Sequence, residues 1–148
     1  MKRKIFLLLG LLAGLLSLPG CNDEKEIDYD KLPAAARTFI EQYFPQQQVT
    51  YAEREREEGG KEYKAVLNNG TELQFDQSGN WQSIECPFST LPQGILPEAI
   101  AAHIAENYPQ VSIYKIEKEL GGYEVGVTGG LELLYASDGT FIRQDTER

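Results

Sequence analysis

YKAVLNNGTELQF, residues 63–75, is the stretch that decides the fold, because the chain repeats its pattern once. The second stretch, YEVGVTGGLELLY, covers residues 123–135 and has Tyr, Gly, Glu, Leu and an aromatic residue at the same positions. A glycine and then an aromatic residue follow each stretch, Gly79 and Trp81 in the first case and Gly139 and Phe141 in the second. A pattern of this length that occurs twice predicts two copies of one supersecondary unit.

Within each stretch, apolar and polar residues alternate as they do in β-strands. Tyr63, Ala65 and Leu67 fall on one face of a strand. Residues 68–70, Asn-Asn-Gly, then favour a hairpin turn, because Asn and Gly tolerate positive φ. One charged strand precedes this hairpin and a further strand follows it. Each unit is therefore expected to contain about four antiparallel strands.

A helix is predicted before each set of strands. Pro33 and Pro97 stand at a favoured first helical position, whereas Pro45 and Pro109 cannot continue a helix. Between these prolines, apolar residues recur at helical spacing and form one stripe. We expect one apolar layer from the first copy and its repeat from the second: Phe39, Ile40, Phe75 and Trp81, and Ile100, Ile104, Tyr135 and Phe141.

The predicted fold class is α+β, with two tandem helix-plus-antiparallel-meander repeats that form one sheet with two helices on one face. The expected single domain covers residues 31–146. It divides into repeat one (31–86), a linker (87–95) and repeat two (96–146). Because the linker is short, the repeats should share a sheet or pack tightly.

The N-terminus has the layout of an export signal. A basic start, residues 1–4, is followed by an apolar run that is too short for a comfortable transmembrane helix. Leu18-Pro19-Gly20-Cys21 resembles a bacterial lipobox, which predicts a lipoprotein signal peptide over residues 1–20 and lipidation of Cys21. An ordinary signal peptide with a coincidental Cys is the alternative. Residues 21–30 are expected to form an acidic flexible tether.

Charge limits the partners that the chain can take. The formal net charge is −9, and the loss of Lys2, Arg3 and Lys4 with the signal makes it −12. So acidic a chain lacks the footprint of a nucleic-acid-binding protein. Anionic lipid head groups would also repel it, so the membrane is contacted through the lipid anchor alone. The expected location is the cell envelope, at the outer membrane, on its periplasmic side or on the cell surface.

The order of these motifs resembles the PepSY-like family, also described as β-lactamase-inhibitor-like. The motifs are a helix ended by proline, a strand, Tyr-x-Ala or Tyr-x-Val, Gly-x-Glu-Leu-x-aromatic and Gly-x-aromatic, twice over behind an export signal. The resemblance covers Lys31 to Asp145. It implies a secreted or periplasmic protein of tandem repeats with a curved antiparallel sheet. In the true β-lactamase inhibitor proteins, the concave sheet face grips the enzyme.

Two departures limit what the resemblance implies here. Those inhibitors carry disulfides, whereas lipidation of Cys21 would leave Cys86 alone. No inhibitory loop residue matches a position of this chain. The resemblance therefore extends to the fold and to a binding function, and not to inhibition of β-lactamase.

Candidate catalytic residues have structural explanations. His103 is the only His, so neither a Ser-His-Asp triad nor a His-based metal site has its parts, and His103 is expected to pack against the sheet. Cys86 follows Glu85, which disfavours a reactive thiolate. Glu72 and Glu132 are expected on the solvent face, where lysines can pair with them.

Residues 76–80 begin like a calcium loop. Trp81 and Pro87 hold the positions where such a loop needs Gly and Glu, so a turn is predicted. No catalytic residue, metal or cofactor is expected, and the protein is interpreted as a non-enzyme.

One favoured function and two alternatives remain open. The favoured one is a lipid-anchored envelope module that holds a protein or peptide, with a basic partner favoured, on the open sheet face. The alternatives are an envelope hydrolase that uses sheet-face carboxylates and an inhibitor of a secreted enzyme. The predicted partner-binding residues are Tyr114, Ile116, Leu134 and Ile142.

Overall fold

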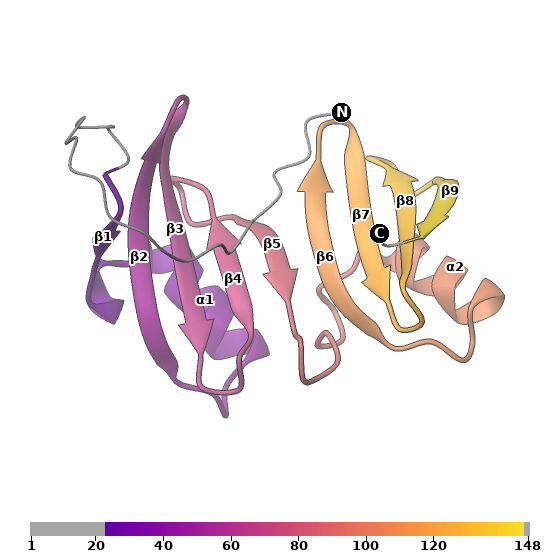
Figure 1. The fold of residues 1–148 in the computed structure, drawn as a ribbon, viewed down its shortest axis with the longest axis horizontal. Coiled ribbons are helices and arrows are strands. Elements are labelled where there is room, and N and C mark those ends of the chain that lie inside the picture. Colours follow the sequence, from indigo (N-terminus) through magenta and orange to yellow (C-terminus); the bar gives the residue numbers. More distant parts are fainter. Residues whose placement is uncertain (1–22, 147–148) are drawn as a thin grey trace, which may run out of the picture.

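The computed structural model describes residues 23–146, which form one nine-stranded sheet and two α-helices (Figure 1). The strands lie in chain order, from β1 at one edge to β9 at the other, and each is antiparallel to its neighbours. The elements are β1 (Lys25–Glu26), η1 (Tyr29–Lys31), α1 (Ala34–Tyr43), β2 (Val49–Glu57), β3 (Gly60–Leu67), β4 (Glu72–Phe75), β5 (Trp81–Glu85), α2 (Glu98–Asn107), β6 (Ile113–Glu119), β7 (Gly122–Val127), β8 (Leu131–Ala136) and β9 (Phe141–Thr146).

The predicted signal peptide and Cys21 lie outside the described residues. Among the residues that are described, no helix has the length and apolar character needed to cross a membrane.

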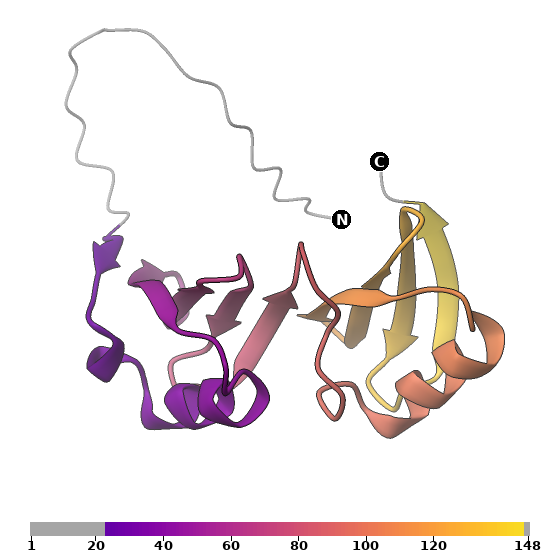
Figure 2. The same ribbon diagram turned by 90° about the horizontal axis from the view of Figure 1, so that it is seen from below.

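The molecule has two layers. Figure 2 shows a curved sheet with both helices on the same side of it. The helices begin and end alike: Pro33 and Pro97 precede them with extended backbone, and Phe44 and Tyr108 follow them with φ near −130° (−129° and −131°). Each of the last two residues is followed by proline, which stops the helix. The α+β class and the shared helix face are as predicted.

For comparison we call residues 23–86 the first half and residues 87–146 the second half. Each half has a helix and then four strands in the same order. The register also corresponds, because Arg54 lies opposite Tyr63 in the first half and Lys118 lies opposite Tyr123 in the second. Each of these pairs stands two residues from a buried pair, Ala52 with Ala65 and Ile116 with Val125.

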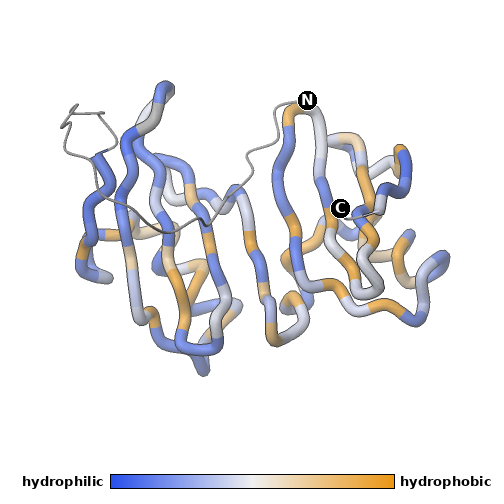
Figure 3. Tube along the Cα trace, viewed as in Figure 1, coloured by the Kyte–Doolittle hydropathy of each residue, from blue (hydrophilic) through white to orange (hydrophobic). Residues whose placement is uncertain are grey.

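A single row of buried side chains crosses the sheet on the side of the helices. Each member lies directly opposite the next, and all are at most 3% exposed. The row consists of Ala52, Ala65, Leu73, Ile84, Ile116, Val125 and Leu133. Hydrophobic and hydrophilic residues alternate along the strands, as this one-sided burial requires (Figure 3). The two halves therefore share one core rather than two.

Most of the predicted core residues pack as expected. Ile100, Phe75 and Tyr135 are at most 1% exposed. The Phe39 ring meets the Phe75 ring edge-on at 6.0 Å. Trp81 differs, because it is half-buried and its ring lies 6.4 Å from the Tyr123 ring, across the junction between the halves.

The predicted flexible tether is partly built into the fold. Lys25 and Glu26 pair with Arg54 and Glu53 of β2, and the Ile27 amide donates to the Ala52 carbonyl at 2.9 Å. Ile27 also packs against the core. The prediction from composition was wrong for these residues, because one apolar side chain and an open strand edge are enough to hold them.

Candidate functional site

The sheet face turned away from α1 and α2 is the candidate site, and we call it the open face. Its side chains are those that alternate with the buried row, and most of them are charged. The charged members from β3 to β9 are Glu62, Lys64, Glu72, Glu85, Lys115, Glu117, Glu119, Glu124, Glu132, Arg143 and Asp145.

Four carboxylates surround Lys115 of the second half. The Nζ atom of Lys115 lies 3.6 Å from Glu117 and 3.7 Å from Glu124. Burial alone would lower the pKa of Lys115, but these carboxylates, with Glu85 and Glu132 beyond them, raise it above its usual value.

The surroundings of Glu124 raise its pKa. Only 20% of its side chain is exposed. Burial raises its pKa, the charge of Glu132 raises it further, and the ion pair with Lys115 offsets these effects only in part. The ionised form of Glu124 is thus disfavoured in the fold, and an additional positive charge nearby would stabilise it.

The first half arranges the corresponding positions differently. Lys64 stands where the second half has Glu124, and it pairs with Glu72 at 3.6 Å. The Tyr51 hydroxyl donates to Glu53, where the second half has the Lys115–Glu117 pair. This hydrogen bond, with burial, raises the pKa of Tyr51 to about 12. The first half thus has an ion pair, Lys64 with Glu72, where the second half has two carboxylates, Glu124 and Glu132.

Tyr114 occupies the open face because of a β-bulge. Ile113 pairs with Val127 and Lys115 with Gly126, so Tyr114 is the extra residue of β6. Its ring lies over Gly126, so close that a Cβ there would be 3.1 Å from the ring and 3.2 Å from the hydroxyl. Gly126 therefore leaves the space that Tyr114 fills.

The same bulge overturns one predicted site residue. Strict alternation had placed Ile116 beside Tyr114 on the open face. The extra residue shifts the alternation by one, so Ile116 faces the helices and is 0% exposed, in the middle of the buried row. Ile116 is a core residue and cannot contact a partner.

Leu134 and Ile142 differ in solvent exposure. Leu134 is half-buried on the open face, between Glu124 on one side and Arg143 on the other. Ile142 is 56% exposed at a bulge in the outer strand β9. Charged side chains thus interrupt the apolar ones, and the second half presents a mixed surface rather than a continuous apolar patch.

The other candidate residues have structural partners. The His103 ring stacks on Phe141 at 4.6 Å, and its Nδ1 lies 3.0 Å from the Tyr135 hydroxyl. Cys86 is buried, and burial raises the pKa of its thiol. Among residues 23–146, no group of His, Cys, Asp and Glu is arranged to hold a metal ion.

The predicted turn after Phe75 is present. The Asp76 carboxylate accepts hydrogen bonds at 2.9 Å from the backbone amides of Ser78 and Asn80. Although burial opposes it, these bonds lower the pKa of Asp76 below its usual value. Asp76 therefore serves as the acceptor that closes a turn.

These features define a class of protein: a small two-layer α+β protein in which both helices of residues 23–146 lie on the same face of the sheet. The chain belongs to the family described as "Putative beta-lactamase-inhibitor-like, PepSY-like", whose model matches residues 21–60 and 61–143. The family resemblance read from the motifs is thus confirmed.

Solved structures of Bacteroides proteins have the same fold. A "putative periplasmic protein" of the DUF2874 family from Bacteroides vulgatus is 35% identical, with a TM-score of 0.81 over 86% of this chain and 100% of its own. A "putative calcium-regulated periplasmic protein" from Bacteroides thetaiotaomicron is 32% identical, with a TM-score of 0.80 over 84% of this chain and 98% of its own. No curated protein matches the chain.

Proposed function

We propose that this protein is a non-catalytic binding module of the cell envelope that holds a basic segment of a protein or peptide on the open face of its second half. One observation carries the proposal: Glu124 is kept half-buried among other carboxylates, at a cost that the corresponding Lys64 avoids. A cationic side chain between Glu124 and Glu132 would relieve that cost on binding.

The surroundings of Glu124 suit an extended partner. Tyr114 offers an aromatic surface over Gly126, Leu134 lies beside Glu124, and Ile142 is exposed at the outer strand. Aromatic and apolar contacts inside a charged rim are a common composition of protein interfaces. We therefore assign Tyr114, Leu134 and Ile142 to the contact surface, with Glu124 and Glu132 as its charged part.

The proposed location follows from the N-terminus and from the relatives. Solved relatives are described as periplasmic. We propose that residues 1–20 are removed, that Cys21 is lipidated and that the domain acts at the outer membrane. The domain would consist of two tandem repeats of one structural unit. Replacing Cys21 by Ser should move the protein from the membrane pellet to the soluble fraction. A Cys21→Ser protein that stays in the pellet and still incorporates palmitate would exclude this anchor.

Partner capture tests the binding proposal. A photo-reactive residue at Glu132 on the open face should cross-link an envelope protein in cells, whereas the same residue at the exposed Ala101 of α2 should not. Capture should weaken as salt rises, since the proposed contact is electrostatic. Equal cross-linking from both positions would contradict the proposal.

Substitution of the contact surface gives the matched comparison. The double variant Tyr114→Ser/Leu134→Ser should lose capture while the protein remains folded, with only a small decrease in melting temperature because both side chains are half-buried. Thr50→Ser/Gln74→Ser changes the corresponding positions of the first half and should leave capture intact. Strong destabilisation by the first variant would assign its side chains to the core instead.

Inhibition of a secreted enzyme is a second candidate, favoured by the family's description as β-lactamase-inhibitor-like. The domain would then reduce hydrolysis of a β-lactam by a purified β-lactamase in proportion to its concentration. An unchanged rate at a large molar excess of the domain would remove that enzyme class from consideration.

A further inference from the structure

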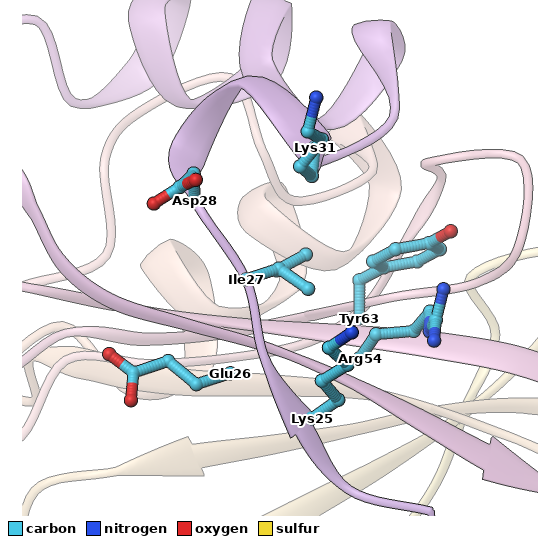
Figure 4. Close-up of a pocket in the computed structure, with 7 residues that line it drawn as sticks. All are labelled: Lys25, Glu26, Ile27, Asp28, Lys31, Arg54 and Tyr63. Atoms are coloured by element: carbon cyan, nitrogen blue, oxygen red, sulfur yellow. The ribbon is translucent and has the colours of Figure 1, made fainter.

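A hollow at the β1 edge of the molecule is the starting point, and we call it the edge pocket. Its volume is about 630 Å³ and it lies on the helix side, away from the open face. Figure 4 shows the Tyr63 ring beside Ile27, with the basic side chains around it and Glu26 directed to the opposite side. The residues that line it are Lys25, Glu26, Ile27, Asp28, Lys31, Arg54 and Tyr63.

The second half shows what the corresponding place can hold. There the counterparts of Arg54 and Tyr63 are Lys118 and Tyr123, which lie opposite each other in the same register. The indole of Trp81 lies against both: its ring is 6.4 Å from the Tyr123 ring, and the Lys118 Nζ is 4.1 Å from its centroid. In this fold, a basic residue opposite a tyrosine thus forms a position where an aromatic ring can pack.

In the first half, Arg54 and Tyr63 form the same arrangement, but the neighbouring strand β1 supplies no aromatic ring. Lys25 of β1 lies directly opposite Arg54, on the side where Trp81 of β5 meets Lys118. β1 has only two residues, whereas β5 has five. The ring-sized space beside Tyr63 therefore stays open.

Two directly opposed cations lie beside the aromatic wall of the edge pocket. Lys25 and Arg54 are like charges in directly opposed strand positions, an arrangement that destabilises a sheet. Lys31 also lines the pocket, but its Nζ lies 3.7 Å from the Asp30 carboxylate, and Glu26 and Asp28 complete the charged lining. Lys25 and Arg54 therefore form the cationic side of the pocket, next to the Tyr63 ring.

We propose that the edge pocket is a binding site for an aromatic group that carries a carboxylate, as an aromatic residue at the C-terminus of a peptide does. The ring packs against Tyr63 and Ile27, as the Trp81 indole packs against Tyr123. The carboxylate lies between Lys25 and Arg54 and offsets their repulsion. This site is separate from the open face and takes a ligand of the opposite charge.

The test uses N-acetyl-tryptophan and two related probes with the mature chain. N-acetyl-tryptophan has both ring and carboxylate, N-acetyl-tryptophanamide lacks the charge, and N-acetyl-alanine lacks the ring. Titration should shift the backbone amide NMR signals of β1, β2 and the Tyr63 region. The amide and the alanine derivative should each bind at least about fivefold more weakly, because each loses one half of the recognition.

Two variants and a control locate the site. Arg54→Gln should weaken N-acetyl-tryptophan about fivefold, whereas Arg56→Gln, which lies on the same strand outside the pocket, should not. Lys25→Trp supplies the ring that the first half lacks, so it should abolish binding while the protein remains folded. Equal binding by the acid and the amide, unchanged binding by Lys25→Trp, or shifts confined to the open face would each overturn the proposal.

Discussion

The two halves of the sheet use one backbone geometry for different surfaces. At the same pair of positions, the first half has Lys64 and Glu72 in an ion pair, and the second half has Glu124 and Glu132 repelling each other. The helix side differs too. Trp81 packs against Tyr123 in the second half, whereas the corresponding Tyr63 of the first half lines an open pocket. Since both versions sit on the same fold, neither is required by folding, and the differences mark where function can be sought.

The largest effect should come from the junction between the halves. Ile84 is 0% exposed and lies opposite Ile116, whereas Ile27, which takes the corresponding place next to Ala52 at the β1 edge, is only half-buried. Ile84→Ala should therefore lower the free energy of unfolding by about 3 kcal/mol, and Ile27→Ala by about 1 kcal/mol. Urea unfolding followed by circular dichroism measures both. Equal losses would mean that the β1 edge is as tightly packed as the centre.

A smaller loss is expected from Trp81→Ala. Full burial of a large aromatic side chain would make truncation cost about 3–5 kcal/mol, but Trp81 is half-buried, so about 2 kcal/mol is expected. Because Trp81 is the only Trp, its fluorescence reports directly on the junction. Tyr123→Leu should change that emission in the folded protein. An emission unaffected by Tyr123→Leu would contradict the contact between the two rings.

The smallest expected change in the free energy of unfolding comes from replacing a glutamate of the open face by Gln, and its sign differs between the two halves. Glu124→Gln should raise the free energy of unfolding at pH 7 by a few tenths of a kcal/mol, roughly the scale of one cross-strand pair. Glu72→Gln removes an attractive pair with Lys64 and should lower it by a similar amount. Urea unfolding at pH 7 compares the two variants.

The pH dependence of Glu124→Gln has a defined direction. A raised pKa in the folded state means that the stability linked to protonation of Glu124 is fully present below the usual Glu pKa of 4.5 and is lost as pH rises through the folded pKa. The Gln variant does not suffer this loss, so its advantage should vanish as pH falls toward 4.5. An advantage that persists at lower pH would have a cause other than charge.

Alternation and turn residues were sufficient to predict the hairpins, the helix limits and the helix-covered face. They failed at Ile116, because a bulge at Tyr114 adds one residue to the strand and nothing in the pattern IYKI reveals it. They also missed β1, since a charged stretch predicts mobility and the pairing of Lys25 depends on an edge that only the folded sheet provides. The crowding of Glu124 arises from cross-strand neighbours, which a linear pattern does not specify.

The unbroken buried row has a consequence for how the molecule opens. Ile84 and Ile116 join the halves through the same row that holds each half together, so separating the halves would expose the centre of the core. Unfolding should therefore be a single cooperative transition, with slow amide exchange from β3 to β8 and faster exchange at β1 and β9. Local opening should therefore occur mainly at the two outer strands, while the strands that carry Glu124 and Trp81 keep their backbone hydrogen bonds.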